Sequence, residues 1–175
     1  MKGSLMSLLQ QLKHWFSDPP ADRVSAGPAP VTLELGQLQR SPRDCVLMLD
    51  FDGVLHPYQS GSLEHLPRLE EWLRATPHVD VVISSSWRES HSLDQLKQYF
   101  SPDLRDRVIG TTPLIYGAKR LAEINCLVQV YRIRHWVAID DDLPEFPDRT
   151  RLIATDTSTG ITDKTIDSLN KYCCP

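Results

Sequence analysis

From residue 45 onward the chain alternates between two hydrophobic patterns. The first is a short, nearly continuous apolar run, typical of a buried strand, and it predicts strands at 45–50, 79–83, 107–109, 136–139 and 151–154. The second places apolar residues at helical spacing and predicts helices at 66–75, 93–100, 118–130 and 162–172. Alternation of this kind indicates an α/β fold. We expect a Rossmann-like three-layer sandwich around a central, mostly parallel sheet with right-handed crossovers.

The first 44 residues follow a different pattern. Residues 1–16 predict an amphipathic helix, and residues 17–44 read as a linker rich in Pro, Ala and Ser. Alternation at 31–36 predicts a short edge strand within that linker. Packing of the helix on the domain is favoured over docking to a partner or a membrane surface, because its polar face carries only two lysines and one histidine. We therefore expect residues 1–44 to precede a domain at 45–175.

Polar clusters follow three of the predicted strands. Asp50, Asp52 and Gly53 end the first strand, residues 84–86 are all serine, and residues 140–142 are all aspartate. Each cluster by itself could be a turn or a helix cap. Because ligands bind beyond the carboxyl ends of parallel strands, the three clusters together predict one shared site.

The acidic clusters favour metal-assisted phosphoryl transfer. Asp50, Asp140 and Asp141 would form an oxygen-rich pocket suited to Mg²⁺, and we expect Asp52 to belong to the metal-binding set as well. A carboxylate nucleophile is a known route for phosphoryl transfer through an aspartyl-phosphate. Asp50 is the candidate nucleophile. Asp52 would protonate the leaving oxygen and later activate water.

Other residues are placed to bind the transferred phosphate. The Ser84 hydroxyl and the Ser85 N–H could donate to phosphoryl oxygens, and Lys119 or Arg120 could balance the charge. Neighbours on a helix point about 100° apart, so the pattern leaves open which of the two cations serves.

Three further residues near the clusters keep two interpretations each. For His56, a structural role in the loop and a contact with substrate weigh equally, and Arg88 is expected to contact substrate or a neighbouring carboxylate. Asp142 could bind metal or cap a turn. Arg132, Arg134 and His135 form a small basic cluster, which we expect to lie in a solvated loop at the far edge of the sheet.

These motifs, in this order, resemble the four motifs of the haloacid dehalogenase (HAD) superfamily. D-F-D-G-V-L with Asp50 and Asp52 resembles the first motif, Ser84 the second, Lys119 or Arg120 the third, and Asp140 with Asp141 the fourth. The resemblance spans residues 45–172 and implies a phosphatase rather than a dehalogenase, because the second acid of the first motif is present. The segments S-S-S-W-R, T-T-P and K-R-L-A-E-I resemble a smaller bacterial branch linked to multidomain RNA-repair proteins.

Members of this superfamily often carry a cap domain, but this chain leaves little room for one. Residues 53–83 separate Asp52 from Ser84, and the helix predicted at 66–75 takes up much of that stretch. By resemblance, an open site would suit a phosphate on a large molecule, such as a nucleic-acid end or a phosphoprotein. A small-molecule substrate, a phosphotransferase and a non-catalytic binding or regulatory module stay open as alternatives.

Composition narrows the setting of this chemistry. The chain has 175 residues, a formal net charge of -4 and four cysteines. That charge does not support a broad basic surface for nucleic acid, although a local basic patch is compatible with it. No apolar run approaches the roughly 20 residues needed to span a membrane. The cysteines show neither zinc-site nor disulfide-framework spacing, so we expect a cytoplasmic protein.

Overall fold

A computed structural model describes residues 36–173. Its centre is a five-stranded, all-parallel sheet in the order β3-β2-β1-β4-β5. The strands are β1 (Cys45–Leu49), β2 (Val79–Ile83), β3 (Val108–Thr111), β4 (Trp136–Asp140) and β5 (Leu152–Ala154). The α/β prediction is therefore confirmed. The helix predicted at 1–16 lies outside the described residues, as does all but the last residue of the edge strand predicted at 31–36.

Four α-helices connect or follow the strands: α2 (Leu66–Ala75), α3 (Leu93–Lys97), α4 (Arg120–Tyr131) and α5 (Asp163–Cys173). Helix α3 is shorter than the predicted 93–100, because the N–H of Phe100 bonds the carbonyl of Lys97, three residues back, in a tighter turn. The ring of Phe100 is still buried. Helix α4 begins two residues later than predicted, because the backbone of Lys119 is extended (φ -78, ψ 153).

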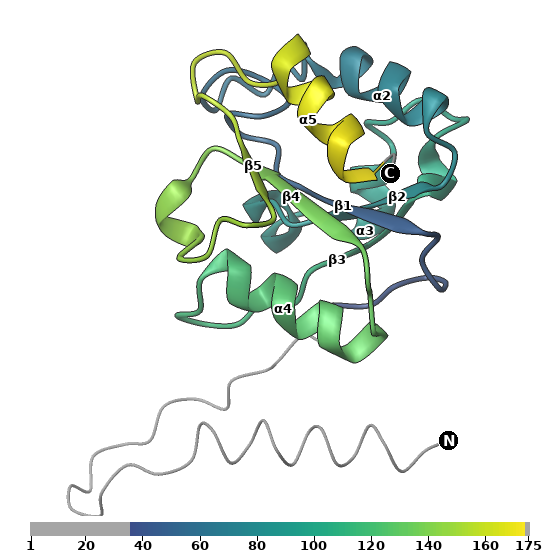
Figure 1. The fold of residues 1–175 in the computed structure, drawn as a ribbon, viewed down its shortest axis with the longest axis vertical. Helices are drawn as coiled ribbons and strands as arrows, with labels where there is room; N and C mark the ends of the chain where they lie inside the picture. The colour runs from purple at the N-terminus through teal and green to yellow at the C-terminus, as the bar shows by residue number, and fades with distance from the viewer. Residues whose placement is uncertain (1–35, 174–175) are drawn as a thin grey trace, which may run out of the picture. The chain divides into compact units, whose positions relative to one another are not determined.

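The sheet is covered on both faces, which explains its unbroken apolar strands. Leu47 and Leu49 of β1 pack in the core under α2, α3 and α5, whereas Val46 and Met48 pack in the core against α4. Figure 1 shows α2 and α5 on one side of the sheet and α4 on the other. The three-layer sandwich is thus confirmed, and each core is buried between the sheet and its helices.

The segment before β1 runs along the edge of the sheet. Leu38 forms an isolated bridge with Gly110 of β3. The Arg40 guanidinium donates two hydrogen bonds to Asp80, at 2.7 and 2.6 Å, and Asp80 is fully buried. Residues 36–44, which the sequence assigned to a linker, are thereby tied to the domain.

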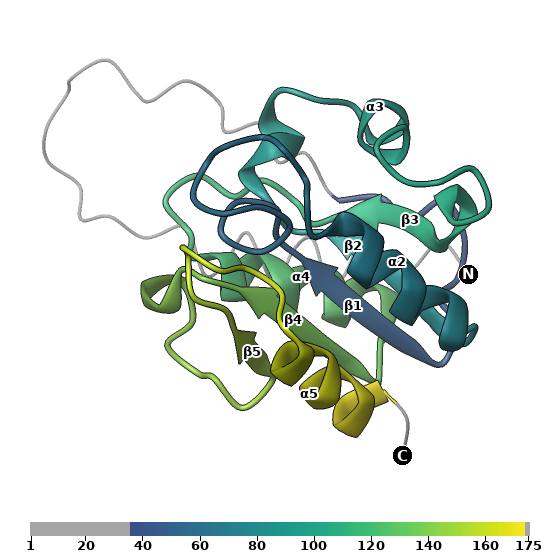
Figure 2. The ribbon, with the colours of Figure 1, turned by 90° about the horizontal axis from the view of Figure 1, so that it is seen from above.

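The topology places the first strand at the centre of the carboxyl edge of the sheet. β1 lies between β2 and β4, as Figure 2 shows from above. Among residues 36–173, no separate cap covers this edge, since α2 is the only α-helix between β1 and β2. No helix in the same range is long and apolar enough to cross a membrane.

Candidate active site

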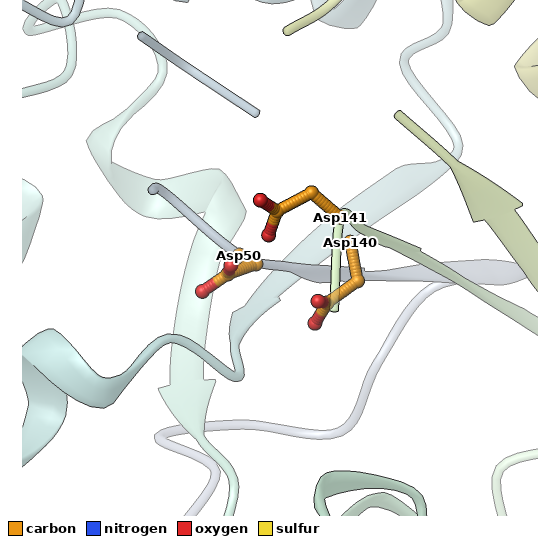
Figure 3. Close-up of side chains that lie close together, drawn as sticks. All are labelled: Asp50, Asp140 and Asp141. Carbon is orange, nitrogen blue, oxygen red and sulfur yellow. The ribbon is translucent and has the colours of Figure 1, made fainter. Parts of the chain in front are cut away.

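Three carboxylates gather at the ends of β1 and β4. Asp50 follows β1 directly, and Asp140 is the last residue of β4. The register pairs Leu49 with Ile139, and the Asp50 N–H donates to the Ile139 carbonyl at 3.1 Å. Asp50, Asp140 and Asp141 each offer an oxygen within 4.8 Å of the others, and Figure 3 shows their side chains gathered together. The predicted meeting of the first and fourth motifs is therefore present.

Burial raises the pKa of two of these acids. Asp50 is 3% exposed and Asp140 is fully buried. Burial raises the pKa of Asp50, although Arg120 and hydrogen bonds from Phe51 and Ser85 oppose the change. Burial, together with the charge of Asp50, raises the pKa of Asp140 to about 7. The cluster therefore favours an added positive charge, and hard carboxylate oxygens are the donors that suit Mg²⁺. The residues present fit that ion.

Arg120 is the cation of this cluster. Its Nη1 lies 3.2 Å from Asp50 Oδ2 and also donates to Asp140. Burial alone would lower the pKa of Arg120, but Asp50 and Asp140 together raise it. Its own N–H, in the first turn of α4, donates to Glu145 at 2.8 Å. The guanidinium is thus held against both acids.

Lys119 is directed elsewhere. Its Nζ donates to the carbonyl of Pro144 at 2.8 Å, and the residue does not line the cleft that contains Asp50. Because Lys119 is the extended N-cap of α4, its side chain does not follow the helical rotation assumed from the sequence. Of the two candidate cations, the fold brings Arg120 to the acids.

Gly53 allows Asp141 to approach the first motif. Its φ is +64°, and a Cβ at this position would lie 2.1 Å from Asp141 Oδ2. Its N–H donates to Tyr58 and its carbonyl accepts from the Thr155 hydroxyl. Glycine is therefore favoured here, because the backbone is left-handed and any Cβ would force the Asp141 side chain to move.

Asp52 has a different environment from Asp50. Its carboxylate is partly exposed and accepts a hydrogen bond at 2.9 Å from the indole Nε1 of Trp87. His56 Nε2 lies 3.4 Å from its other oxygen. Asp52 is not one of the three gathered carboxylates, and its expected share in metal binding stays a prediction. The sequence indicated His56 only by its closeness to the first motif.

The serines after β2 lie at the same edge. Ser84 is 1% exposed, and its Oγ is one of the buried side-chain atoms in the described range that has no hydrogen-bond partner. Ser85 is the N-cap of the 3-10 helix η1 (Ser86–Glu89), and its Oγ accepts the backbone N–H of Trp87. A buried hydroxyl without a partner is unfavourable, so Ser84 is suited to donate to a bound oxygen.

Arg88 holds the serine segment through its backbone carbonyls. Its Nη1 donates to the carbonyls of Ser84 and Ser85, and its Nη2 pairs with Glu123 of α4. It thus contacts a neighbouring carboxylate, one of the two contacts expected of it. The basic residues Arg132 and Arg134 line a separate cavity, at the amino end of the strands, as predicted.

The acids open into a cleft of about 630 Å³. Asp50, Asp52 and Arg120 are among the residues that line it. Asp142 also lines the cleft, while its N–H donates to Asp140 at 2.9 Å, so it combines a place in the cleft with a turn-stabilising bond. Tyr58, which is 62% exposed, forms part of the rim.

Comparison with known proteins places this site in a family. A family model described as the HAD domain in Swiss Army Knife RNA repair proteins matches residues 46–166. Searches of curated proteins and of solved structures give no match. The matched range holds all four motifs, from Asp50 to Asp141. The chain therefore belongs to the HAD domains found in Swiss Army Knife RNA repair proteins.

Proposed function

We propose that this protein is a Mg²⁺-dependent phosphohydrolase that acts through an aspartyl-phosphate on Asp50. The observation that carries the proposal is a pair of carboxylates, two residues apart, with separate surroundings in one cleft. Asp50 is buried among charged groups, whereas Asp52 is partly exposed and contacts an indole N–H. Such a difference in surroundings is what assigns distinct roles to two acids.

The residues divide the reaction into two displacements. An oxygen of Asp50 attacks phosphorus as the ester bond breaks, and Asp52 gives its proton to the leaving oxygen. Water then attacks the phosphorus, the bond to Asp50 breaks, and Asp52 recovers a proton from that water. The Ser84 hydroxyl, which has no partner among the described residues, would donate to a phosphoryl oxygen.

The charged residues hold the nucleophile and its surroundings in place. Asp50, Asp140 and Asp141 would hold Mg²⁺, which when bound neutralises the acids and polarises the phosphoryl oxygens. Arg120 keeps Asp50 and Asp140 oriented through its contacts with both. Gly53 leaves the space that Asp141 occupies.

The open cleft supports a large phosphorylated substrate. Among residues 36–173 no cap closes over the acids, so the rest of a substrate could extend past the exposed ring of Tyr58. A nucleic-acid end is the candidate we favour, because the family is described from RNA repair proteins. The net charge of -4 adds no support for a broad nucleic-acid surface.

A phosphate-release screen tests the proposal. Its panel would hold nucleotides, sugar phosphates, phosphopeptides and oligonucleotides with terminal phosphates, each with Mg²⁺ and with chelator. We expect metal-dependent release that Asp50→Asn abolishes. A folded wild-type protein that binds a member of the panel and leaves it unchanged would contradict hydrolysis and indicate a binding module. Phosphate recovered on an added alcohol instead of water would indicate a phosphotransferase.

A further inference from the structure

Both oxygens of the Asp52 carboxylate face a ring nitrogen. Trp87 Nε1 donates to Oδ2 at 2.9 Å, and His56 Nε2 lies 3.4 Å from Oδ1. The Asp52 side chain is 23% exposed, so without neighbours it would sample several orientations. The two rings stand where they restrict that freedom.

His56 lies beside the carboxylate of Asp52. It is fully buried, and its Nδ1 lies 3.3 Å from the Gly61 N–H. The Gly61 N–H and the Ser60 hydroxyl, also at 3.3 Å, can donate to Nδ1, whereas the Pro57 carbonyl at 3.4 Å can accept from it. In the tautomer that accepts from Gly61, the ring proton is on Nε2. Nε2 makes no hydrogen bond within the described residues, and an Asp52 oxygen lies 3.4 Å from it, within reach as an acceptor.

Trp87 is fixed by other aromatic rings. Phe51 meets its indole edge-on with ring centroids 5.2 Å apart, and His91 stacks on it at 5.7 Å. The backbone N–H of Trp87 donates to Ser85 Oγ, which ties this residue to the serine segment. A donor held in this way keeps its direction while the carboxyl group gains and loses a proton, because an indole N–H only donates.

We propose that Trp87 and His56 are positioning residues that hold Asp52 in the orientation from which it protonates the leaving group. This inference rests on the proposed phosphohydrolase function. General acid catalysis requires the acid within hydrogen-bond reach of the leaving oxygen, and a freely rotating carboxyl group spends less time there. Trp87 directly follows the serines in the chain, so its hydrogen bond to Asp52 also fixes the position of that acid relative to the serines.

Comparing substrates with different leaving groups shows whether Trp87 positions Asp52 or only supports the structure. A nitrophenolate departs without a proton, whereas an alkoxide needs one from Asp52. The ratio kcat/KM reports the steps up to phosphoryl transfer to Asp50 and excludes the later attack of water. We expect Trp87→Phe to lower kcat/KM about 30-fold for an alkyl phosphate and less than about threefold for nitrophenyl phosphate.

Matched variants control for packing. Trp72→Phe also removes a buried indole N–H, which donates to Asn170 at 2.8 Å; Trp72 does not line the cleft. This variant should leave the ratio of the two kcat/KM values unchanged. His56→Leu should lower the alkyl rate selectively. His56→Gln, which keeps an N–H near the same position, should restore part of that rate.

A second background makes the inference specific to Asp52. In Asp52→Asn protein, Trp87→Phe should have no further effect on the alkyl phosphate, because the group it positions is gone. Active wild-type protein whose substrate ratio is unchanged by Trp87→Phe would overturn the inference alone. Equal loss on both substrates would also overturn it and assign Trp87 a general structural role. Folded wild-type protein that hydrolyses neither substrate would overturn the phosphohydrolase function, and this inference with it.

Discussion

Replacing Arg120 with methionine removes the cation that lies between two buried acids. Its Nη1 is 3.2 Å from Asp50 Oδ2, and at an effective dielectric constant of about 20 that distance corresponds to a gross attraction of about 5 kcal/mol. The variant keeps most of the side-chain volume but leaves Asp50 and Asp140 without their shared partner. Loss of one partner from a buried ion pair destabilises proteins by about 3–5 kcal/mol.

The size of the effect depends on pH in a defined direction. Without Arg120, the two acids relieve their repulsion by taking up protons, and this relief is easiest at low pH. We therefore expect Arg120→Met to lower the free energy of unfolding by about 3 kcal/mol at pH 8 without metal, and by clearly less at pH 5. Mg²⁺ should stabilise this variant more than the wild type, because the ion meets an uncompensated negative cluster.

Urea denaturation followed by circular dichroism measures these free energies, with and without Mg²⁺. Lys119→Met is the matched control, since Lys119 carries the same charge but donates to Pro144 outside the cleft. It should change the free energy of unfolding by less than about 1 kcal/mol. If Lys119→Met is as destabilising as Arg120→Met, or if neither changes stability at pH 8, the placement of Arg120 between the acids is refuted.

Two further predictions concern the acids and the glycine beside them. The pKa of Asp140 is raised from 3.8 to about 7, so the folded protein holds this proton more tightly than the unfolded chain. Its contribution to stability is therefore present below about pH 4 and is lost as pH rises through about 7. In the presence of chelator, Asp140→Asn should reduce the decrease in the free energy of unfolding between pH 4 and pH 8 by on the order of 2 kcal/mol, as measured by urea titrations. An unchanged pH dependence would count against the raised pKa. Gly53→Ala, which needs a left-handed backbone and meets Asp141, should cost about 2 kcal/mol and weaken Mg²⁺ binding in calorimetry, and wild-type affinity would contradict the close approach of Asp141.

The sequence predicts the elements and acids of the site because they depend on strand ends. β2 and α2 have the predicted bounds, since each is a run of one periodicity with a clear end. Asp50 and Asp140 meet because parallel strands deliver their carboxyl ends to one edge. Neither result depends on how any loop folds.

Details that depend on loop conformation could not be predicted. The choice of Arg120 over Lys119 follows from one extended residue at the start of α4, which helical periodicity does not reveal. The contact between His56 and Asp52 requires the chain to turn back after Gly53, and the indole of Trp87 reaches Asp52 across the sheet edge. These contacts depend on the conformation of individual residues and loops, and a hydrophobic pattern carries no information about it.

Trapping the covalent intermediate tests the central claim most directly. Protein mixed with Mg²⁺ and a radiolabelled phosphomonoester would be quenched in acid during turnover, and the labelled peptide would be mapped by mass spectrometry. We predict hydroxylamine-sensitive label on Asp50, none in Asp50→Asn, and more label in Asp52→Asn given an aryl phosphate, because its second step lacks a base. Turnover without label on Asp50, or undiminished turnover by Asp50→Asn, would contradict the aspartyl-phosphate mechanism.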